Sequence, residues 1–286
     1  MSTRLDIRPS PIAGQWYPGD PRKLSESVDR YISEAKLPRL GGAVVAIITP
    51  HAGHVYSGPV AGYAFAAMQG LQPDLVAVVS PMHYPYADAL LTTAHEAYET
   101  PLGTIPVDSE AVSQVSAQLV DKLGFGLASI RHDREHSLEI ELPFLQRSLG
   151  KPFKLLPIMV RDQGSRVTKA LGESLAAVLS SRDALLVAST DLSHFFPQKT
   201  ARMLDAEMLR CIESFDPEAV IQAEEQGRGF ACGRGALAAV LWAARDLGAD
   251  SVRVLNHATS GDVTGDYSQV VGYGAAVVLK SPPKVE

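Results

Sequence analysis

The apolar run Val44–Ile48 constrains the fold of this chain more than any other feature. Its β-branched residues and the stop at Pro50 predict a strand that is covered on both faces. Runs of the same kind recur at Leu75–Val79, Phe153–Val160 and Ala184–Ala188. Segments with helical spacing of apolar residues separate these runs, and strands that alternate with helices are typical of an α/β fold.

The composition is that of an ordinary globular protein. The 286 residues are 46% hydrophobic and 20% charged. This length allows two domains or one large α/β domain. The sequence has no internal repeat, low-complexity block or break in composition that would mark a linker.

Charge and hydropathy exclude two classes of partner. The net charge is −6, and lysines and arginines are scattered singly, so we expect no nucleic-acid partner. The N-terminal residues Met1–Asp6 contain no apolar segment of a signal peptide. No run approaches the roughly 18 apolar residues that span a bilayer. We therefore expect no membrane association and a cytoplasmic location.

The two cysteines, Cys211 and Cys232, are too few for a disulfide framework, and we expect reduced thiols. Cys232 precedes a strongly helical stretch, Ala236–Leu247. A helix N-terminus favours the thiolate because of its dipole and free N–H groups. We therefore expect an ionised Cys232.

Histidines follow the predicted strands. Of the eight histidines, five lie after such runs: His51, His54, His83, His194 and His257, with Asp191 beside His194. In open α/β sheets, ligands bind at the carboxyl ends of the strands. A single buried histidine is usually a satisfied core residue, but this recurrence favours a shared site.

Several imidazoles and a thiolate indicate a transition-metal site. Because no zinc-finger spacing is present, the ligands would come from distant positions. The same residues permit a cysteine-dependent hydrolase, with Cys232 as nucleophile, a histidine base and Asp191 as its orienter. A serine hydrolase is less favoured because the Gly-x-Ser-x-Gly turn is missing, and no Gly-x-Gly-x-x-Gly motif follows a strand.

Two further segments offer pocket residues. Trp16 lies in a loop rich in proline and glycine, where it either caps the core or walls a pocket. The polar segment Arg131–Leu142 contains His136 and Glu139, which would share a face if the segment is helical. The alternative is a solvated helix start with exposed glutamates, Glu141 in particular. For His136 and Glu139 we favour the pocket role.

Six short motifs resemble, in order and spacing, the Memo family, which is called AmmeMemoRadiSam system protein B in bacteria and archaea. They are Ala13–Tyr17, Pro50–Gly53, Ser80–His83, Glu135–Glu139, Ser189–His194 and Cys232–Arg234. The resemblance covers essentially the whole chain.

The resemblance implies a fold similar to class III extradiol dioxygenases, the non-haem iron enzymes that open catechol rings. We expect a single α/β domain over residues 1–286, with residues 281–286 as a polar tail. It would be a three-layer sandwich in which helices flank a central mixed, largely parallel sheet.

The resemblance also implies that His51, His83 and Cys232 are the metal ligands. Fe(II) is the expected metal, and a thiolate ligand makes Cu or Zn alternatives. His194 matches the position of an acid/base histidine, with Asp191 nearby to orient it or to bind substrate.

This chain departs from the vertebrate Memo pattern at His54 and His257, where aromatic residues are more usual, and at Tyr84. These residues either add polar groups to the pocket or are tolerated changes. The predicted pocket residues are Trp16, His54, Tyr84, His136, Glu139 and His257.

Three functions follow. The first is a metal-dependent, dioxygenase-like oxidoreductase that acts on a hydroxylated aromatic or related small molecule. The second is a non-catalytic protein that holds metal or binds a peptide or protein in the same cleft. By resemblance, its partners would be radical-SAM and AMMECR1-type proteins. The third is a metal-free cysteine hydrolase.

Overall fold

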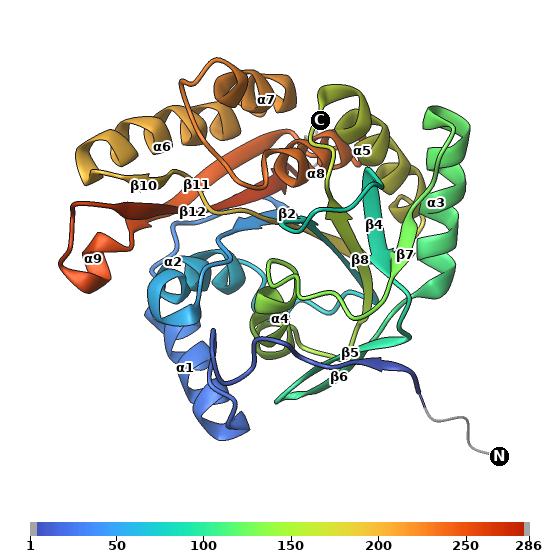
Figure 1. Cartoon of the computed structure of the whole chain (residues 1–286), viewed down its shortest axis with the longest axis horizontal. Coiled ribbons are helices and arrows are strands. Elements are labelled where there is room, and N and C mark those ends of the chain that lie inside the picture. Colours follow the sequence, from blue (N-terminus) through green and yellow to red (C-terminus); the bar gives the residue numbers. More distant parts are fainter. Residues whose placement is uncertain (1–4, 283–286) are drawn as a thin grey trace.

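The computed structural model describes residues 5–282, so most of the expected polar tail and residues 1–4 lie outside the described part. It has three layers, with a large sheet between two layers of helices (Figure 1). The helices are α1 (Pro21–Glu34), α2 (His54–Ala66), α3 (Ser109–Leu123), η1 (Glu139–Glu141), α4 (Leu142–Ser148), α5 (Ser165–Leu179), α6 (Gln198–Glu213), α7 (Pro217–Glu225), α8 (Arg234–Asp246) and α9 (Gly261–Thr264). The strands are β1 (Ile7–Arg8), β2 (Ala43–Thr49), β3 (Leu75–Pro81), β4 (Leu90–Thr93), β5 (Ala97–Thr100), β6 (Gly103–Pro106), β7 (Ala128–Ile130), β8 (Lys154–Val160), β9 (Ala184–Ser189), β10 (His194–Phe196), β11 (Ser251–Thr259) and β12 (Val270–Lys280).

The large sheet is mixed, and its parallel part is the centre. Its order is β10-β12-β2-β9-β3-β8-β4-β7, with β11 beside β12. The four central strands β2, β9, β3 and β8 are parallel, whereas β12 joins β2 and β4 joins β8 antiparallel. The predicted sandwich and its mixed sheet are confirmed, and the carboxyl ends of the central strands meet at one edge.

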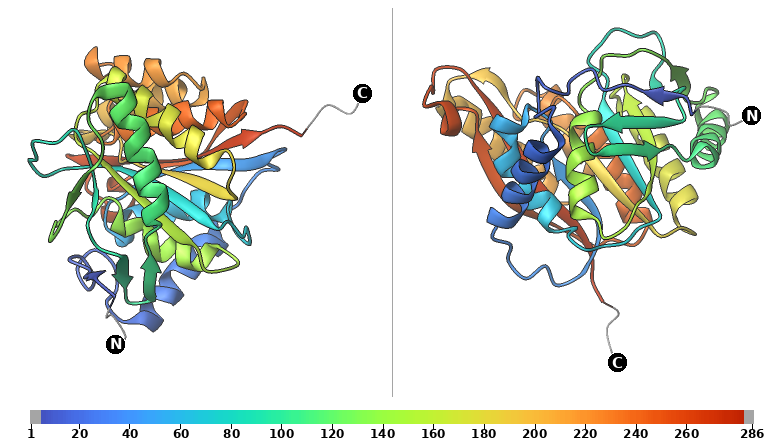
Figure 2. Two further views of the ribbon diagram at one scale, coloured as in Figure 1. Left: turned by 90° about the vertical axis from the view of Figure 1, so that its right-hand side faces the viewer. Right: turned by 90° about the horizontal axis from the view of Figure 1, so that it is seen from below.

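The sheet separates two hydrophobic cores, and alternation along β3 shows why. Leu75, Ala77 and Val79 face the core under α3, α5 and α8. Val76 and Val78 face the core under α1, α2 and α4. Both faces of the strand are therefore buried, as the continuous apolar run predicts. Figure 2 shows the two helical layers on either side of the sheet.

The register of the central strands positions the site. Thr49 at the end of β2 pairs with Ser189 at the end of β9. The chains that follow, one beginning at Pro50 and the other at Thr190, therefore leave the sheet side by side. A hydrogen bond from Thr190 N to Thr49 O (2.9 Å) continues the pairing beyond the strands.

Two local expectations were wrong. Residues 131–138 form no helix, so His136 and Glu139 do not share a helix face. The carboxylate of Glu135 accepts hydrogen bonds from the backbone N–H groups of His136 and Ser137, and these bonds hold an irregular turn instead. His257 lies within a strand rather than after one, because β11 continues to pair with β12 through His257 and Gly274.

Within residues 5–282, no helix combines the length and apolarity required to cross a membrane.

Candidate metal centre

His51 stands just beyond the carboxyl end of β2 and is 2% exposed. Its Nδ1 lies 3.0 Å from the Ser189 hydroxyl, which is itself 2.7 Å from Glu141 Oε1. The hydroxyl fixes the ring and leaves Nε2 as the nitrogen that can bind a metal. Burial, with the nearby Asp191 charge, raises the pKa of Glu141 well above its ordinary value. Glu141 is thus buried and its charged form is disfavoured, which corrects the expectation of an exposed glutamate.

His83 follows β3 and is oriented by a buried carboxylate. Glu135 Oε1 lies 2.9 Å from His83 Nδ1, and Oε2 accepts a hydrogen bond from His83 N at 2.6 Å. Burial is the largest single effect and opposes ionisation of Glu135, but the hydrogen bond and charge of His83, with smaller contributions from His136 and Ser137, together outweigh it and lower the pKa to about 2. The His83 ring keeps Nε2 free and is partly exposed.

His136 completes a group of three imidazoles. Its ring stacks on His83, with centroids 4.9 Å apart, and meets His51 edge-on at 5.5 Å. One possible ligand atom from each of these histidines lies within 4.8 Å of the others. Since metal–nitrogen bonds are about 2.0–2.1 Å for zinc, one ion could be shared by all three with small adjustments. Glu135 also lies 3.3 Å from His136 Nδ1, so one carboxylate orients two of the rings.

Cys232 lies two residues before α8 and contacts this group on one side. Its Sγ is 3.1 Å from His51 Nε2 and accepts a hydrogen bond from Asp191 N at 3.3 Å. Among the described residues, the sulfur is not part of the three-imidazole group. Both cysteines are free thiols, as expected.

The surroundings of Cys232 in the metal-free protein oppose the expected ionisation. Burial and the Asp191 charge raise the pKa of this thiol well above its ordinary value. Desolvation disfavours the thiolate more than the helix terminus stabilises it. A bound cation would reverse this preference because its charge stabilises a coordinated thiolate.

Asp191 holds the backbone that carries His51. Its Oδ1 accepts hydrogen bonds from the N–H groups of His51 (2.7 Å) and Ala52 (3.3 Å). Burial raises the pKa of Asp191 to about 7 against the effect of these bonds. Both hydrogen bonds to Asp191 Oδ1 thus come from backbone amides. In a hydrolase triad the acid instead accepts a hydrogen bond from the imidazole that it orients.

His194 begins β10 and has a defined tautomer. Its Nδ1 lies 2.8 Å from Leu192 O, so Nδ1 carries the proton and donates it to that carbonyl. Nε2 is therefore unprotonated in the neutral ring. Burial lowers the pKa of His194, which favours this neutral form. The rings of Phe195 and Phe230 pack against it.

The predicted pocket residues fall into two groups. Trp16, Tyr84 and His136 line one hollow of about 340 Å³, and the Trp16 and His136 rings are 4.1 Å apart. The remaining pocket residues, His54, Glu139 and His257, make other contacts.

His54 is buried in the core, where its Nε2 donates to Ile140 O and its ring packs on Tyr17 and Phe144. Glu139 is bound to Arg8 and Tyr17. His257 lies on β11, 2.8 Å from Asp205.

Sequence reasoning missed the residues that orient the imidazoles. Glu135, Ser189 and Glu141 were not selected as site residues, although all three lie in or beside the quoted motifs. The sequence could have indicated two of them as site residues, because Glu135 precedes a candidate histidine and Ser189 ends a buried strand.

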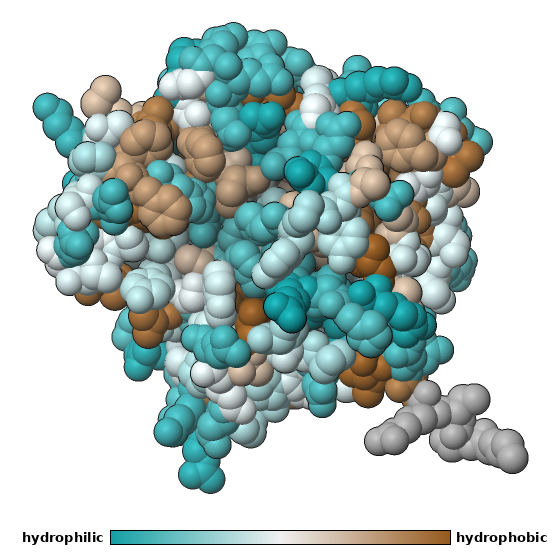
Figure 3. All heavy atoms as spheres, in the orientation of Figure 1, coloured by the Kyte–Doolittle hydropathy of each residue, from teal (hydrophilic) through white to brown (hydrophobic). Residues whose placement is uncertain are grey.

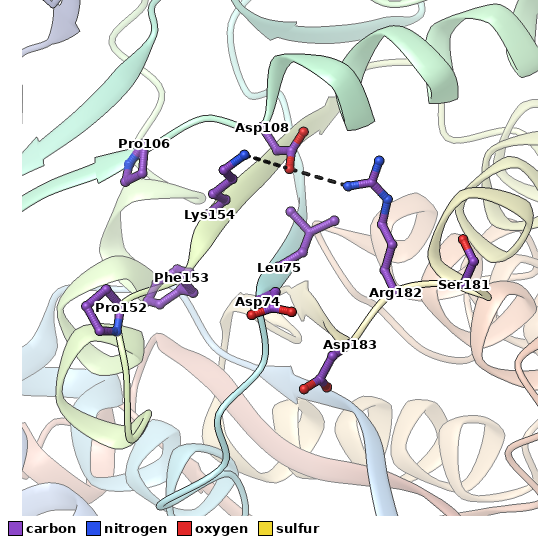
Figure 4. Close-up of a pocket in the computed structure, with 10 residues that line it drawn as sticks. All are labelled: Asp74, Leu75, Pro106, Asp108, Pro152, Phe153, Lys154, Ser181, Arg182 and Asp183. Carbon is purple, nitrogen blue, oxygen red and sulfur yellow. Dashed lines mark hydrogen bonds and ion pairs between the residues drawn. The ribbon is translucent and has the colours of Figure 1, made fainter.

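A larger hollow of about 620 Å³ lies at the opposite edge of the sheet, where β3, β8 and β9 begin (Figure 4). Both cationic side chains of its wall contact the same carboxylate. Asp108 lies 3.5 Å from Lys154 and 3.4 Å from Arg182. Neither cation is therefore free of a carboxylate partner, and the three histidines remain the candidate site.

Comparison with known proteins agrees with the quoted motifs. The family model described as Memo-like protein matches residues 8–277. The chain belongs to the Memo family. Its Memo relatives include a MEMO1 family protein of Nitrosopumilus maritimus, 37% identical, with 94% of this chain and 98% of the relative aligned. Another, from Thermotoga neapolitana, is 35% identical over 95% of this chain and 99% of the relative.

A third MEMO1 family protein, from Methanosarcina acetivorans, is 33% identical over 96% of this chain and 100% of the relative. The names of these three relatives state the family and no reaction. The Memo-family assignment therefore rests on sequence similarity over nearly the full length, and the reaction has to be argued from the site.

Proposed function

We propose that this Memo-family protein is a metal-dependent, dioxygenase-like oxidoreductase acting on a hydroxylated aromatic or related small molecule. The observation that supports this most is the convergence of His51, His83 and His136. Their Nδ1 atoms face Ser189 or Glu135, so each ring can present Nε2 to one ion. Oriented imidazoles of this kind are typical of transition-metal centres.

His51 and His83 are the two ligands that both lines of argument share. The resemblance adds Cys232 as the third ligand, whereas the distances favour His136. Three imidazoles suit Fe(II) or Zn(II), and a thiolate would favour Cu(I) or Zn(II). We propose Fe(II) first. The ion would supply Lewis acidity, and a redox-active ion would also allow reaction with O₂.

His194 is the proposed acid/base residue. Because Nδ1 donates to Leu192 O, Nε2 is the atom that can accept a proton from a substrate hydroxyl. Asp191 supports the proposal by holding the backbone of His51 in place. Trp16 and Tyr84 would border the substrate.

A non-catalytic Memo protein is the alternative, and exposed apolar side chains favour it. Phe195, Phe196 and Met203 are 68%, 38% and 66% exposed. Figure 3 shows apolar atoms gathered over this part of β10 and α6. Such a patch is a feature of protein-binding surfaces. In this reading the metal is structural, and radical-SAM or AMMECR1-type proteins would be the partners.

The 3.1 Å contact between Cys232 Sγ and His51 Nε2 supports the third function, a cysteine hydrolase. In that reading His51 would be the base, and no metal would be needed. The raised pKa of the thiol argues against it, because the nucleophile of such enzymes is activated towards the thiolate.

Metal content and oxygen uptake distinguish the three functions. We expect anaerobically purified protein to retain iron, and His51→Ala and His83→Ala to lose it. We also expect oxygen uptake with a catechol that His194→Ala abolishes at unchanged metal content. Retained metal without any oxygen uptake would favour the non-catalytic alternative, and hydrolytic activity in metal-free protein would favour the third function.

The third ligand is tested by a matched pair of variants. Cys232→Ala and His136→Ala each remove one candidate and leave His51 and His83 in place. The variant that loses iron identifies the ligand. If both variants bind iron as tightly as the unmodified protein, neither residue is a ligand.

A further inference from the structure

A second hollow also borders Trp16, and four aromatic side chains form part of its wall. It has a volume of about 520 Å³, and Trp16, Tyr56, Phe195 and Tyr273 contribute to its wall. Small-molecule sites are typically hollows of about 300–1,000 Å³ with apolar and aromatic walls. This hollow therefore has the size and the wall of a small-ligand site.

The hollow adjoins the candidate metal centre. Trp16 lies 4.1 Å from the His136 ring between their centroids, and Trp16 O accepts a hydrogen bond from His54 N at 2.8 Å. Ala52 and Gly53, which directly follow His51, form part of the same wall. A molecule in this hollow would lie beside the chain that carries His51.

Phe195 is held over this hollow by an unusual backbone conformation. Its φ is 62°, in the left-handed region that non-glycine residues rarely adopt, and it directly follows His194. Its side chain is 68% exposed although it lines the hollow. A strained, exposed aromatic residue beside a catalytic candidate is the kind of feature that persists at ligand sites.

The wall carries no cationic side chain. Asp266 is its one ionisable acid, and no lysine, arginine or histidine of the described residues lines the hollow. The Asp266 carboxylate accepts hydrogen bonds from Ser268 N (2.9 Å) and Ser268 Oγ (2.6 Å). An anionic group placed here would therefore find no counter-charge and would face a carboxylate.

We propose that this hollow binds an uncharged aromatic ring system of the substrate and excludes substrates with an anionic substituent on that part. The inference rests on the proposed function only in taking the metal centre as the place of reaction. Ring stacking on Trp16, Tyr56 and Phe195 supplies the affinity, and the missing cation supplies the selectivity.

The test uses a matched pair of probes with metal-free, full-length protein. The probes are naphthol and hydroxynaphthalene sulfonate, which share a ring system and differ in one anionic group. In calorimetric titrations we expect naphthol to bind at least about tenfold more tightly than the sulfonate. We expect Tyr56→Ala and Phe195→Ala to weaken naphthol binding by about three- to tenfold each, because stacking is worth roughly that factor.

Two controls locate the binding. Phe125→Ala removes a partly exposed aromatic side chain outside the hollow and should leave the affinity for naphthol unchanged. Trp16 also borders a neighbouring hollow whose wall contains Arg134, a cation to which the sulfonate could bind. The affinity for the sulfonate is therefore measured again with the Arg134→Gln variant. Tyr56→Arg places a cation in the wall and should make the sulfonate bind more tightly than naphthol.

The proposal is overturned if the sulfonate binds Arg134→Gln as tightly as naphthol does. It is also overturned if Tyr56→Ala and Phe195→Ala leave the naphthol affinity unchanged. Both aromatic side chains are at least 44% exposed, so these variants should fold. An iron titration of the same samples reports separately on the metal centre, so failure of this proposal and failure of the proposed function are distinguishable.

Discussion

At the scale of single residues, one buried carboxylate orients two of the three imidazoles of the candidate metal centre. Glu135 contacts His83 Nδ1 at 2.9 Å and His136 Nδ1 at 3.3 Å. It also accepts the backbone N–H groups of both residues. The positions and tautomers of two imidazoles therefore depend on this side chain.

The variant Glu135→Gln tests this dependence. Loss of the charged acceptor should lower the affinity for metal by about 10- to 100-fold, the usual cost of removing a partner of a metal-binding histidine. The affinity is measured by anaerobic titration with Fe(II). Glu173→Gln, a change in an exposed ion pair with Lys122, is the control and should leave the affinity unchanged. Equal affinities in both variants would contradict the assigned role of Glu135.

His54 predicts a pH effect on stability. Burial lowers the pKa of His54 from 6.5 to about 4, although its hydrogen bond to Ile140 O opposes the shift. In the unfolded chain this imidazole gains its proton below pH about 6.5, whereas in the folded protein it does so only near pH 4. Between these values the unfolded state binds more protons, so the free energy of unfolding falls as the pH falls.

The contribution of His54 to the free energy of unfolding is fully present above pH about 6.5 and is lost towards pH 4. The loss amounts to ~3 kcal/mol in total. His54→Gln keeps a donor for Ile140 O and removes the titration. Denaturant unfolding between pH 7 and 4 should therefore show a shallower loss of stability in His54→Gln than in the unmodified protein. A change of the exposed His132 to Gln is the control. Equal pH dependence in the unmodified protein and His54→Gln would refute the prediction.

At the scale of elements, the short strand β1 fixes the segment that carries His136. Arg8 is 2% exposed and binds Asp133 through Nε and Nη2 at 3.1 and 2.7 Å. Its Nη1 lies 2.6 Å from Glu139 Oε2, and Nη2 also donates to Glu135 O. One side chain thereby links Asp133, Glu135 and Glu139, which lie on either side of His136.

Arg8→Met should destabilise the protein by about 3–5 kcal/mol, because two buried carboxylates lose their counter-charge. Arg147→Met is the matched control. Arg147 also binds a carboxylate through two nitrogens, at 2.8 and 2.6 Å to Asp29, but on the surface. That change should cost about 0–1 kcal/mol. Chemical denaturation measures both, and a similar cost for the two variants would contradict the role of β1.

The elements that the sequence predicted well are those with a local signal. Helices α3 and α7 each begin after a capping aspartate whose side chain accepts backbone N–H groups. The expected strand Leu75–Val79 lies within β3. In these segments the periodicity of apolar residues and the caps determine the conformation.

The features that the sequence did not indicate depend on partners distant in sequence. The irregular turn at Glu135 is held by Arg8, more than a hundred residues earlier. The strand β10 exists through its pairing with Val270 and Val271 of β12. Burial and Asp191 raise the pKa of the Cys232 thiol, and its neighbours in sequence indicate neither effect. The strand-end histidines His51 and His83 could be predicted as candidate ligands, but not that His136 lies close to both.

At the scale of the whole molecule, the candidate ligands come from separate connections on one sheet. His51 follows β2, His83 follows β3, and His136 lies between β7 and η1. Their arrangement exists only when the strands are paired, so metal binding should favour the folded state. This coupling gives a prediction that does not depend on the reaction.

Fe(II) at about 100 times its dissociation constant should raise the free energy of unfolding by about 2.7 kcal/mol under anaerobic conditions. Thermal unfolding with and without the ion measures the effect. The double variant His51→Ala, His83→Ala should show no stabilisation by the ion. If the ion stabilises this double variant as much as the unmodified protein, it binds elsewhere.

The most direct test of the central claim is the metal content of anaerobically purified protein with and without His83. We predict about one iron per chain in the unmodified protein, as expected for a single site, and a near-complete loss in His83→Ala measured by elemental analysis on the same preparation. Equal iron content in the two proteins would contradict the assignment of the metal centre to the carboxyl ends of the central strands.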